Sequence, residues 1–423
     1  MNSNKLKAAI MSGDFDKSFL RLYGQTEVPR ERFSAAVDEF CALYGDAGDL
    51  RLFSAPGRTE IGGNHTDHQH GSVLAASVDL DVIAVVAKNN ENTVRIKSKG
   101  YNMDEIDLSS LSKKESERGR AAALIRGVLF KFSQAGYDLG GFNAYTTSNV
   151  LKGSGLSSSA AFEVLVSNIL NGLFCENKVD ALSIAKYSQY AECEYFGKPC
   201  GLLDQMASSV GGFTYADFHD PQDPKVEQVN LDVREFGYTL SVVDTGGNHA
   251  NLTADYAAIT EECREISRAL GVEFLRDANE QRFYDNMGTF RKKFGDRAVL
   301  RAFHFFNEQK RVELQRQALK DKDFEKFLYY VNESGESSYK YLQNLYSNSN
   351  VNEQGLSLAI ALTKQFLKGK GACRVHGGGF AGTIQCYIPN DVFEDYKKMI
   401  EYVFGKGACV PLLVRPVGGC EVK

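Results

Sequence analysis

The sequence lacks an excess of positive charge, a long apolar run and any paired cysteine motif. Its 423 residues carry 49 basic and 54 acidic side chains, and the net charge of −5 creates no overall basic field that would attract nucleic acid or anionic lipid. The purest apolar run, Val82–Ala87, is bounded by Asp81 and Lys88 and is far shorter than a membrane span. The N-terminal residues contain no continuous apolar stretch of the kind found in signal peptides. We therefore expect a cytoplasmic protein with no nucleic-acid partner and no membrane partner.

Cysteine is scattered along the chain rather than paired. The nine cysteines stand singly, none forms a Cys-x-x-Cys pair, and most lie in apolar stretches. An odd number without metal-ligand spacing is typical of reduced, buried thiols. It argues against a disulfide framework and against a zinc site.

The chain also lacks internal repeats and low-complexity tracts. Its composition, 43% hydrophobic and 24% charged, is typical of a globular protein, and its length predicts two domains. The polar segment His219–Lys225 contains two of the eight prolines and is the predicted boundary. The expected domains are residues 1–218 and 226–423.

Hydrophobic periodicity predicts the order of the elements. Helices are predicted over residues 5–45, 120–135, 157–174, 180–196, 201–210 and 253–270, followed by a mainly helical stretch to about residue 368 and a helix over 391–404. Strands are predicted over residues 78–87, 94–97, 142–147, 213–218, 238–243, 372–376, 383–388 and 409–415. If the long helical stretch is a single crossover, the second half has the order β-α-β-β-α-β, a split, ferredoxin-like arrangement. The fold class is therefore α+β.

Residues 153–161, Gly-Ser-Gly-Leu-Ser-Ser-Ser-Ala-Ala, open a long apolar helical run after a predicted strand. The first N–H groups of a helix lack partners and the helix dipole is positive there, so phosphate groups bind at such positions. No Gly-Lys-Ser/Thr ends the stretch, and both the Walker A loop and the GxGxxG fingerprint are disfavoured. The stretch is either a phosphate cradle or a flexible turn.

A second stretch, Ser54–Asp67, contains a guanidinium, an amide, an imidazole and a carboxylate, from Arg58 and from Asn64-His65-Thr66-Asp67. Glycines beside them allow the backbone to approach a ligand closely. These side chains supply the donors and acceptors that vicinal hydroxyl groups require. A polar loop with an Asx turn is the alternative.

Two further segments contain residues capable of chemistry. Glu192 and Asp204 flank a Gly-Lys-Pro-Cys-Gly break between two predicted helices, where an acidic residue can also simply complement a helix dipole at the surface. The segment Arg374–Thr383 links two strands through four glycines, more than a tight hairpin needs. We expect this loop to pass close to another backbone or to a ligand.

Together these stretches resemble the GHMP kinases, and among them the galactokinases most closely. The matching segments are Pro56-Gly57-Arg58 with His65-Thr66-Asp67, Gly153–Ala160, Cys200–Gln205, Asp244–Tyr256 and Arg374–Gly382. The resemblance covers most of the chain and implies a two-domain GHMP kinase fold. Its N-terminal domain would be ribosomal-S5-domain-2-like, and its C-terminal domain ferredoxin-like with a helical insertion. The implied reaction transfers the γ-phosphoryl group of ATP, with Mg²⁺, to the anomeric hydroxyl of galactose or a close relative.

The resemblance also implies roles for individual residues. Asp204 matches the catalytic aspartate that accepts the sugar hydroxyl proton, and Arg58 matches the arginine that neutralises charge beside it. Ser159 and Glu192 match the ligands of Mg²⁺, a cation that prefers oxygen and keeps several waters. The residues that match nucleotide contacts are Ser98, Gly153, Ser154, Gly155, Leu156, Ser157, Ser158 and Ser159, and those that match sugar contacts are Asn64, His65, Thr66, Asp67 and Tyr256.

The sequence departs from the galactokinase pattern at several positions. Asn64 stands where the family carries a glutamate that contacts the sugar near its 6-hydroxymethyl group, and Glu60 stands where the family carries asparagine. We therefore expect altered or relaxed specificity at C6, with galacturonate, L-arabinose or N-acetylgalactosamine as alternative substrates. The remaining differences are at Gly62, His68, His376 and Ala381.

A non-catalytic sensor of sugar and ATP is the alternative from a different class, because galactokinase-like proteins can act as regulators. Arg58, Glu192 and Asp204 are all present, which favours an enzyme. We expect a monomer or a weak dimer whose partners are a small sugar and ATP.

Overall fold

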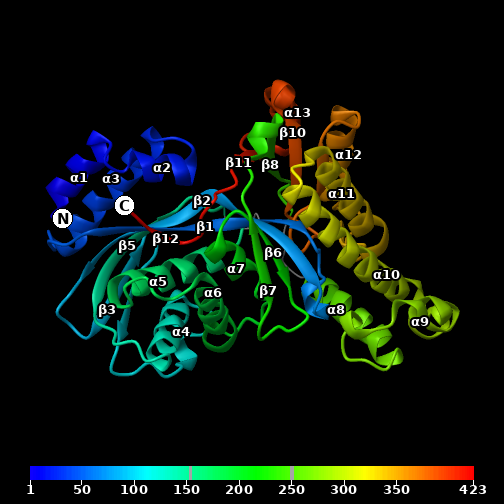
Figure 1. Ribbon diagram of the computed structural model, residues 1–423, viewed down its shortest axis with the longest axis horizontal. Coiled ribbons are helices and arrows are strands. Elements are labelled where there is room, and N and C mark those ends of the chain that lie inside the picture. Colours follow the sequence, from blue (N-terminus) through cyan, green and yellow to red (C-terminus); the bar gives the residue numbers. More distant parts are fainter. Residues whose placement is uncertain (152–154, 248–251) are drawn as a thin grey trace.

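The computed structural model describes residues 1–151, 155–247 and 252–423. These residues form two β-sheets, one in the half of the molecule that holds both termini and one beside a group of long helices (Figure 1). No helix within the described ranges has the length and apolar character needed to cross a membrane.

The larger sheet is built on a long hairpin of β1 (Arg51–Gly62) and β2 (Ser72–Lys88). Its order is β12-β1-β2-β5-β3-β4, with β6 paired to the first part of β2 and β7 paired to β6. Neighbouring strands run antiparallel except β3 and β5. The other strands are β3 (Thr93–Ser98), β4 (Met103–Asp107), β5 (Phe142–Ser148), β6 (Phe213–Asp217), β7 (Lys225–Val229) and β12 (Cys420–Val422).

This sheet is covered on both faces, and alternate residues of β2 show how. Ala84 and Val86 belong to the main core, while Ile83 and Val85 belong to a second buried cluster. Successive side chains of a strand point to opposite faces, so a strand that is covered on both faces is apolar throughout. The apolar run Val82–Ala87 is therefore the C-terminal part of β2, where the strand is covered on both faces.

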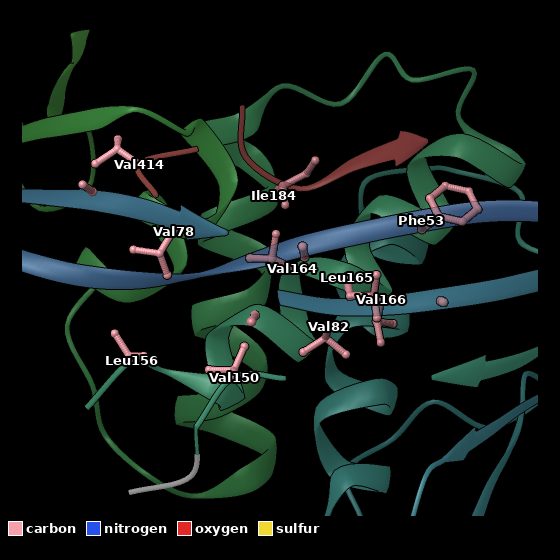
Figure 2. Packing of buried hydrophobic residues seen from close by; sticks show 14 of the residues in the cluster. Phe53, Val78, Val82, Val150, Leu156, Val164, Leu165, Val166, Ile184 and Val414 are labelled. Atoms are coloured by element: carbon pink, nitrogen blue, oxygen red, sulfur yellow. The ribbon is translucent and has the colours of Figure 1, made fainter. Parts of the chain in front are cut away.

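The main core lies between the sheet and a layer of helices. These helices are α4 (Ala121–Gln134), α5 (Ser158–Phe174), α6 (Ala181–Tyr190), which continues as a π-helical segment over Ala191–Phe196, and α7 (Leu203–Val210). Val164 and Leu165 of α5 share one buried cluster with Phe53 of β1 (Figure 2). The apolar run behind the glycine-serine stretch thus forms the helix that the sequence predicts, and its burial holds the start of α5 against the sheet.

The opposite face of the sheet is covered by the N-terminal helices α1 (Ser3–Ser12), α2 (Asp16–Tyr23) and α3 (Glu27–Tyr44) (Figure 1). The sequence predicts helix over the whole of 5–45, but the structure interrupts it twice. Gly13 and Gly24 end α1 and α2 with φ of 102° and 67°. Glycine adopts these left-handed angles without a steric penalty, so the chain turns there.

A buried charge fixes these N-terminal helices to the sheet. The carboxylate of Asp81 in β2 is fully buried and accepts a hydrogen bond from the hydroxyl of Tyr23 at 2.6 Å. It forms an ion pair with Arg32 of α3 and lies 3.4 Å from the guanidinium of Arg415. A buried carboxylate is tolerated when cations and donors surround it. Asp81 therefore ties together the N-terminal helices, the sheet and the C-terminal segment.

The smaller sheet has the order β11-β8-β10-β9, with all neighbours antiparallel. Its strands are β8 (Tyr238–Asp244), β9 (Ala372–Val375), β10 (Thr383–Pro389) and β11 (Cys409–Leu412). Between β8 and β9 the chain forms α8 (Thr253–Ala269), α9 (Glu280–Asp285), α10 (Met287–Lys320), α11 (Phe324–Ser337) and α12 (Gly355–Leu367), and α13 (Phe393–Phe404) precedes β11. This is the split β-α-β-β-α-β arrangement that the sequence predicts, and the α+β fold class is confirmed.

The polar segment His219–Lys225 does not separate the two sheets, contrary to the predicted boundary. β6 and β7 pair with each other on either side of it, so the segment is the loop of a hairpin within the larger sheet. The chain leaves this sheet only after Val229, and β12 returns at the end to pair with β1. A proline-containing polar loop marks a turn, but whether the chain returns to the same sheet depends on long-range pairing.

We expect Asp81→Asn to lower the free energy of unfolding by about 3 kcal/mol or more, because it removes the buried charge that Arg32 and Arg415 contact. Urea unfolding followed by circular dichroism measures the change. Asp38→Asn is the matched control, since its ion pair with Lys7 is exposed and should matter by less than about 1 kcal/mol. Equal stability of the two variants would contradict the role given to Asp81.

Candidate active site

Asp204, Arg58 and Ser157 meet in the structure although they are far apart in the sequence. Nε of Arg58 donates to Oδ1 of Asp204 at 2.7 Å, and the hydroxyl of Ser157 donates to Oδ2. Nη1 of Arg58 donates to the carbonyl of Gly155. The Arg58 side chain is 9% exposed and that of Asp204 is 34% exposed, so the carboxylate is the accessible member of the pair. The two residues expected to be catalytic thus contact each other and the loop before α5.

The loop before α5 is held closely against β1. The N–H of Arg58 donates to the carbonyl oxygen of Leu156 at 3.0 Å. A Cβ on Gly57 would lie 2.8 Å from that oxygen, so only glycine permits this approach. The Leu156 side chain is fully buried in the cluster that also contains Val150 (Figure 2). The loop is therefore anchored to the core at Leu156; the expected nucleotide contacts Gly153 and Ser154 lie outside the described residues.

The serines that follow occupy the N-terminus of α5. Ser157 precedes the first turn with a φ of 56°, and Ser158 and Ser159 begin the helix. The N–H groups of a first helical turn lack helical partners, and the dipole is positive there. Amides and hydroxyls are thus available beside Asp204, an arrangement that suits the phosphates of a nucleotide.

A cavity of about 690 Å³ opens beside the start of α5, with Ser158 and Phe162 in its lining. Its lining is mainly apolar and includes Ser98 of β3 and Leu124 of α4. The Ser98 hydroxyl accepts a hydrogen bond from the hydroxyl of Thr146 at 2.8 Å. An apolar cavity with a few polar groups, next to a phosphate cradle, suits a nucleotide base. The structure thus brings Ser98 and Ser158, two of the expected nucleotide contacts, to one cavity.

The two expected Mg²⁺ ligands, Ser159 and Glu192, also lie together. The Ser159 hydroxyl donates to Oε1 of Glu192 at 3.2 Å, and Nζ of Lys198 lies 3.0 Å from the same oxygen. In the described part of the chain, no group of three or more His, Cys, Asp or Glu side chains is arranged to hold a metal. A hydroxyl and a carboxylate nevertheless fit Mg²⁺, because this ion completes its shell with waters and substrate phosphates. In this structure the ammonium of Lys198 balances the charge of Glu192.

Gln205 fixes the carboxylate of Glu192, the expected metal ligand. Its amide nitrogen donates to Oε2 of Glu192 at 2.7 Å and to Oε2 of Glu163 at 3.1 Å. Burial, together with the nearby charge of Glu192, raises the pKa of Glu163 well above its usual range. Burial therefore favours the protonated form of Glu163, which shares the amide of Gln205 with Glu192. Since Gln205 follows Asp204 directly, one helical turn positions both the expected base and the expected metal ligand.

Asp67, an expected sugar contact, lies next to the segment that leads to Asp204. A Cβ on Gly201 would come within 2.5 Å of Oδ2 of Asp67, so this close approach requires glycine. Asp67 is only partly buried, and its Oδ1 accepts the N–H of His68. The β1–β2 loop thus borders the segment that leads to Asp204, from the side of the larger sheet.

The rings of His65 and Tyr256 lie beside residues 374–382, which we call the third glycine-rich loop. Their rings lie 6.3 Å apart, Nε2 of His65 is 2.9 Å from the carbonyl of Gly378, and the Tyr256 hydroxyl donates to the carbonyl of Gly379 at 2.9 Å. Burial, followed by the charge of His68, lowers the pKa of His65 to about 4. The imidazole is therefore neutral near pH 7 and offers one donor and one acceptor.

Asn64 and Thr66, also expected to contact the sugar, are instead placed in the interior. Both are fully buried. The amide nitrogen of Asn64 donates to Glu60 and to the carbonyl of Gly377, each at 2.8 Å, and its oxygen accepts from Asn344 at 2.7 Å. The Thr66 hydroxyl bonds to carbonyls of the β1–β2 loop and of β2. Their polar atoms hold the loop together, so in this structure they shape the site without lining it.

The third glycine-rich loop, residues 374–382, passes close to other backbone, as the sequence predicts. A Cβ on Gly379 would lie 2.1 Å from the carbonyl oxygen of Asn344. At the other end, the ring of His376 lies beside Gly155, where a Cβ would be 3.2 Å from Nδ1. The loop therefore extends from the residues expected to contact the sugar to the residues expected to contact the phosphates.

Two residues of α10 support the β1–β2 loop and have no signal in the sequence. The buried Glu308 accepts the N–H of Gly63 at 3.0 Å, and Nε2 of His304 lies 3.0 Å from the carbonyl of Asn64. Burial acts to raise the pKa of Glu308, but the charge of Arg311, the other neighbouring charges and the hydrogen bond from Ser334 together outweigh it and lower the pKa to about 2. Glu308 is thus a carboxylate that fixes the loop. No local pattern marks it, because it lies 245 residues from Gly63.

The sequence is similar to the sequences of known proteins. The family model described as the galactokinase galactose-binding signature matches residues 38–88, and the model of the GHMP kinase N-terminal domain matches residues 123–212. The chain is 31% identical to the galactokinase of Thermotoga petrophila over 356 residues, which cover 81% of this chain and 93% of that protein. It is 27% identical to the galactokinase of Lactococcus lactis over 381 residues, which cover 88% of this chain and 91% of that protein.

Solved structures share the fold. The crystal structure of Lactococcus lactis galactokinase complexed with galactose matches with a TM-score of 0.76 at 22% identity, covering 92% of this chain and 99% of that one. Methanococcus jannaschii mevalonate kinase matches with a TM-score of 0.61 at 13% identity, covering 87% of this chain and 99% of that one. The structural likeness establishes the architecture, and the sequence identity over nearly the whole of known galactokinases establishes the kinship. The chain belongs to the galactokinase family of the GHMP kinases.

Proposed function

We propose that the protein is an ATP-dependent sugar 1-kinase that phosphorylates galactose or a close relative at the anomeric hydroxyl. The observation that carries this proposal is the contact of Asp204 with Arg58 and Ser157 at the N-terminus of α5. A carboxylate, a guanidinium and a helix N-terminus meet at one point. Phosphoryl transfer to a hydroxyl needs mainly such positioning and charge neutralisation, because the charge of its transition state lies on the phosphoryl oxygens.

The proposed nucleotide site runs from the cavity at Ser98 to the first turn of α5. The base fits the mainly apolar cavity, and the phosphates fit the N–H groups and hydroxyls at Ser158 and Ser159. A Mg²⁺ ion held by Ser159 and Glu192 would neutralise charge on the phosphate oxygens. Lys198, which pairs with Glu192 in this structure, would release that carboxylate when the ion binds.

In the proposed reaction Asp204 accepts the proton of the anomeric hydroxyl as the sugar oxygen bonds to the terminal phosphorus. A carboxylate is a weak base toward a free hydroxyl, but it becomes effective because the hydroxyl acidifies during the attack. Arg58 orients this carboxylate and reduces the repulsion between it and the phosphoryl oxygens. The hydrogen bond from Arg58 to the carbonyl of Gly155 holds the guanidinium beside the loop that precedes α5.

The pair Glu60 and Asn64 favours a change of specificity at C6 of the sugar. Relative to the galactokinase pattern, glutamate and asparagine have exchanged places, and Asn64 donates to Glu60 at 2.8 Å. Arg374 also contacts Glu60, at 3.2 Å, so the carboxylate is held in the interior. The loop therefore carries an amide at position 64 where the family carries a carboxylate. We propose that the loop shaped in this way lets galacturonate, L-arabinose or N-acetylgalactosamine compete with galactose as substrates.

Asp204→Asn should abolish turnover and leave ATP binding intact, because the amide keeps the size of the side chain and cannot accept the proton. Arg58→Ala should lower kcat by about 10²- to 10³-fold, the usual effect of losing a group that stabilises transition-state charge. Phosphate transfer assays and calorimetric titration with ATP measure the two effects. The control Asp138→Asn, at an exposed position, should match the unmodified protein. Substantial turnover in Asp204→Asn would mean that another group is the base.

Glu192→Gln should weaken Mg²⁺ binding to the protein–nucleotide complex by about tenfold or more, since even changes beyond the direct ligands cost about that much. Calorimetric titration with Mg²⁺ measures the affinity, and the Mg²⁺ dependence of phosphate transfer should shift in parallel. Glu194→Gln is the matched control, because Glu194 lies on the same π-helical segment but is exposed. If both variants bind Mg²⁺ equally well, Glu192 is not a ligand.

Asn64→Glu alone should lower the melting temperature, because it places a second carboxylate against the buried Glu60. The double variant with Glu60→Asn should recover stability, because it restores one amide and one carboxylate. Thermal unfolding measures both changes.

The same variants test specificity through kcat/KM for galactose, galacturonate, L-arabinose and N-acetylgalactosamine. We expect the double variant to favour galactose over galacturonate more strongly than the unmodified protein does. A strong preference for galactose that is the same in both proteins would remove the idea of altered specificity at C6.

A further inference from the structure

We propose that Cys193 and Cys200 form an oxidisable thiol pair, a modification site that hydroperoxides convert to a disulfide. Their sulfurs lie 3.6 Å apart, in van der Waals contact, although the two residues are seven positions apart in the sequence. A disulfide bond is about 2.05 Å long, so the sulfurs must approach by about 1.5 Å. Both thiols are free and only partly buried, so a small oxidant can reach them.

The surroundings of the pair hold the two sulfurs toward each other. The N–H of Cys200 donates to the sulfur of Cys193 at 3.4 Å, and the thiol of Cys193 lies 3.6 Å from the carbonyl of Cys200. Cys193 belongs to the π-helical segment after α6, and Cys200 to the connection that leads to α7. Closing the bond therefore needs a shift of this connection and no opening of the buried core.

The proposed chemistry balances in two steps. The sulfur of Cys193 attacks the peroxide, the O–O bond breaks, and the products are a sulfenic acid on Cys193 and one water or alcohol. The sulfur of Cys200 then attacks the sulfenic sulfur and displaces water, which leaves the Cys193–Cys200 disulfide. The peroxide is reduced and the two thiols are oxidised. A dithiol reductant reverses the change, as expected of a disulfide that forms transiently inside a cell.

The pair lies against Glu192, the proposed Mg²⁺ ligand, so oxidation of the pair should lower the rate of phosphate transfer. The thiol of Cys200 donates to Oε2 of Glu192 at 3.3 Å, and Gln205 contacts both the same oxygen and the Cys200 sulfur. A Cys200 sulfur drawn to Cys193 would give up this contact with Glu192. The disulfide would also pull on the short connection before Asp204. This consequence rests on the proposed kinase function, whereas the disulfide itself does not.

The test treats the full chain with hydrogen peroxide after removal of reductant and maps its peptides without reduction. We expect a Cys193–Cys200 cross-linked peptide with the loss of two hydrogens, reversed by dithiothreitol and absent in Cys193→Ser. Cys41→Ser is the matched control, because Cys41 is also partly buried but lies on α3, and it should cross-link like the unmodified protein. Separate, uncrosslinked oxidation of the two cysteines, or oxidation of Cys41 or Cys420 in preference to them, would overturn the proposal.

A second readout follows phosphate transfer in the same samples. We expect the rate to fall by about tenfold or more as the cross-link forms, since small displacements of catalytic groups have effects of this size, and to return with dithiothreitol. Cys193→Ser cannot form the cross-link, so it should keep its own initial rate after peroxide treatment. A cross-link without loss of rate would contradict the coupling through Glu192. If the protein transfers no phosphate to any sugar tested, peptide mapping still decides whether the modification site exists.

Discussion

The site depends on the Asp204 carboxylate, which is held between the guanidinium of Arg58 and the hydroxyl of Ser157. A buried guanidinium must be paired, because an unpaired charge in the interior is strongly destabilising. Arg58 meets this need with Asp204 and with the carbonyl of Gly155. The pairing forces β1, the loop before α5 and the start of α7 to converge. The same contact that stabilises the fold thus places a carboxylate beside a helix N-terminus.

The other side of the site is built from a buried polar network. Glu308 and His304 of α10 hold the backbone at Gly63 and Asn64, and Asn64 in turn contacts Glu60. Such networks specify one arrangement when every member has a partner, and they penalise any other. The loop that carries His65 and Asp67 is therefore held in place by buried groups. Within one short motif, Asn64 thus holds the loop in place, whereas His65 and Asp67 are only partly buried.

Local patterns in the sequence predicted the helices behind the glycine-serine stretch, the split arrangement of the second half and the glycine-rich approach at 374–382. Each depends on nearby residues, on helix termini or on alternation. Features that depend on long-range pairing escaped prediction: β12 returns to β1, and His219–Lys225 is a hairpin loop. The direction of Asn64 also escaped it, because a motif identifies a residue but its partners come from α10 and the third glycine-rich loop.

A crystal structure with Mg²⁺ and a non-hydrolysable ATP analogue tests the central claim most directly. We expect the base in the cavity at Ser98, the phosphates along the first turn of α5, and the terminal phosphate facing Asp204 and Arg58 with the metal on Glu192. A nucleotide bound elsewhere, or one whose terminal phosphate points away from Asp204, would contradict the claim.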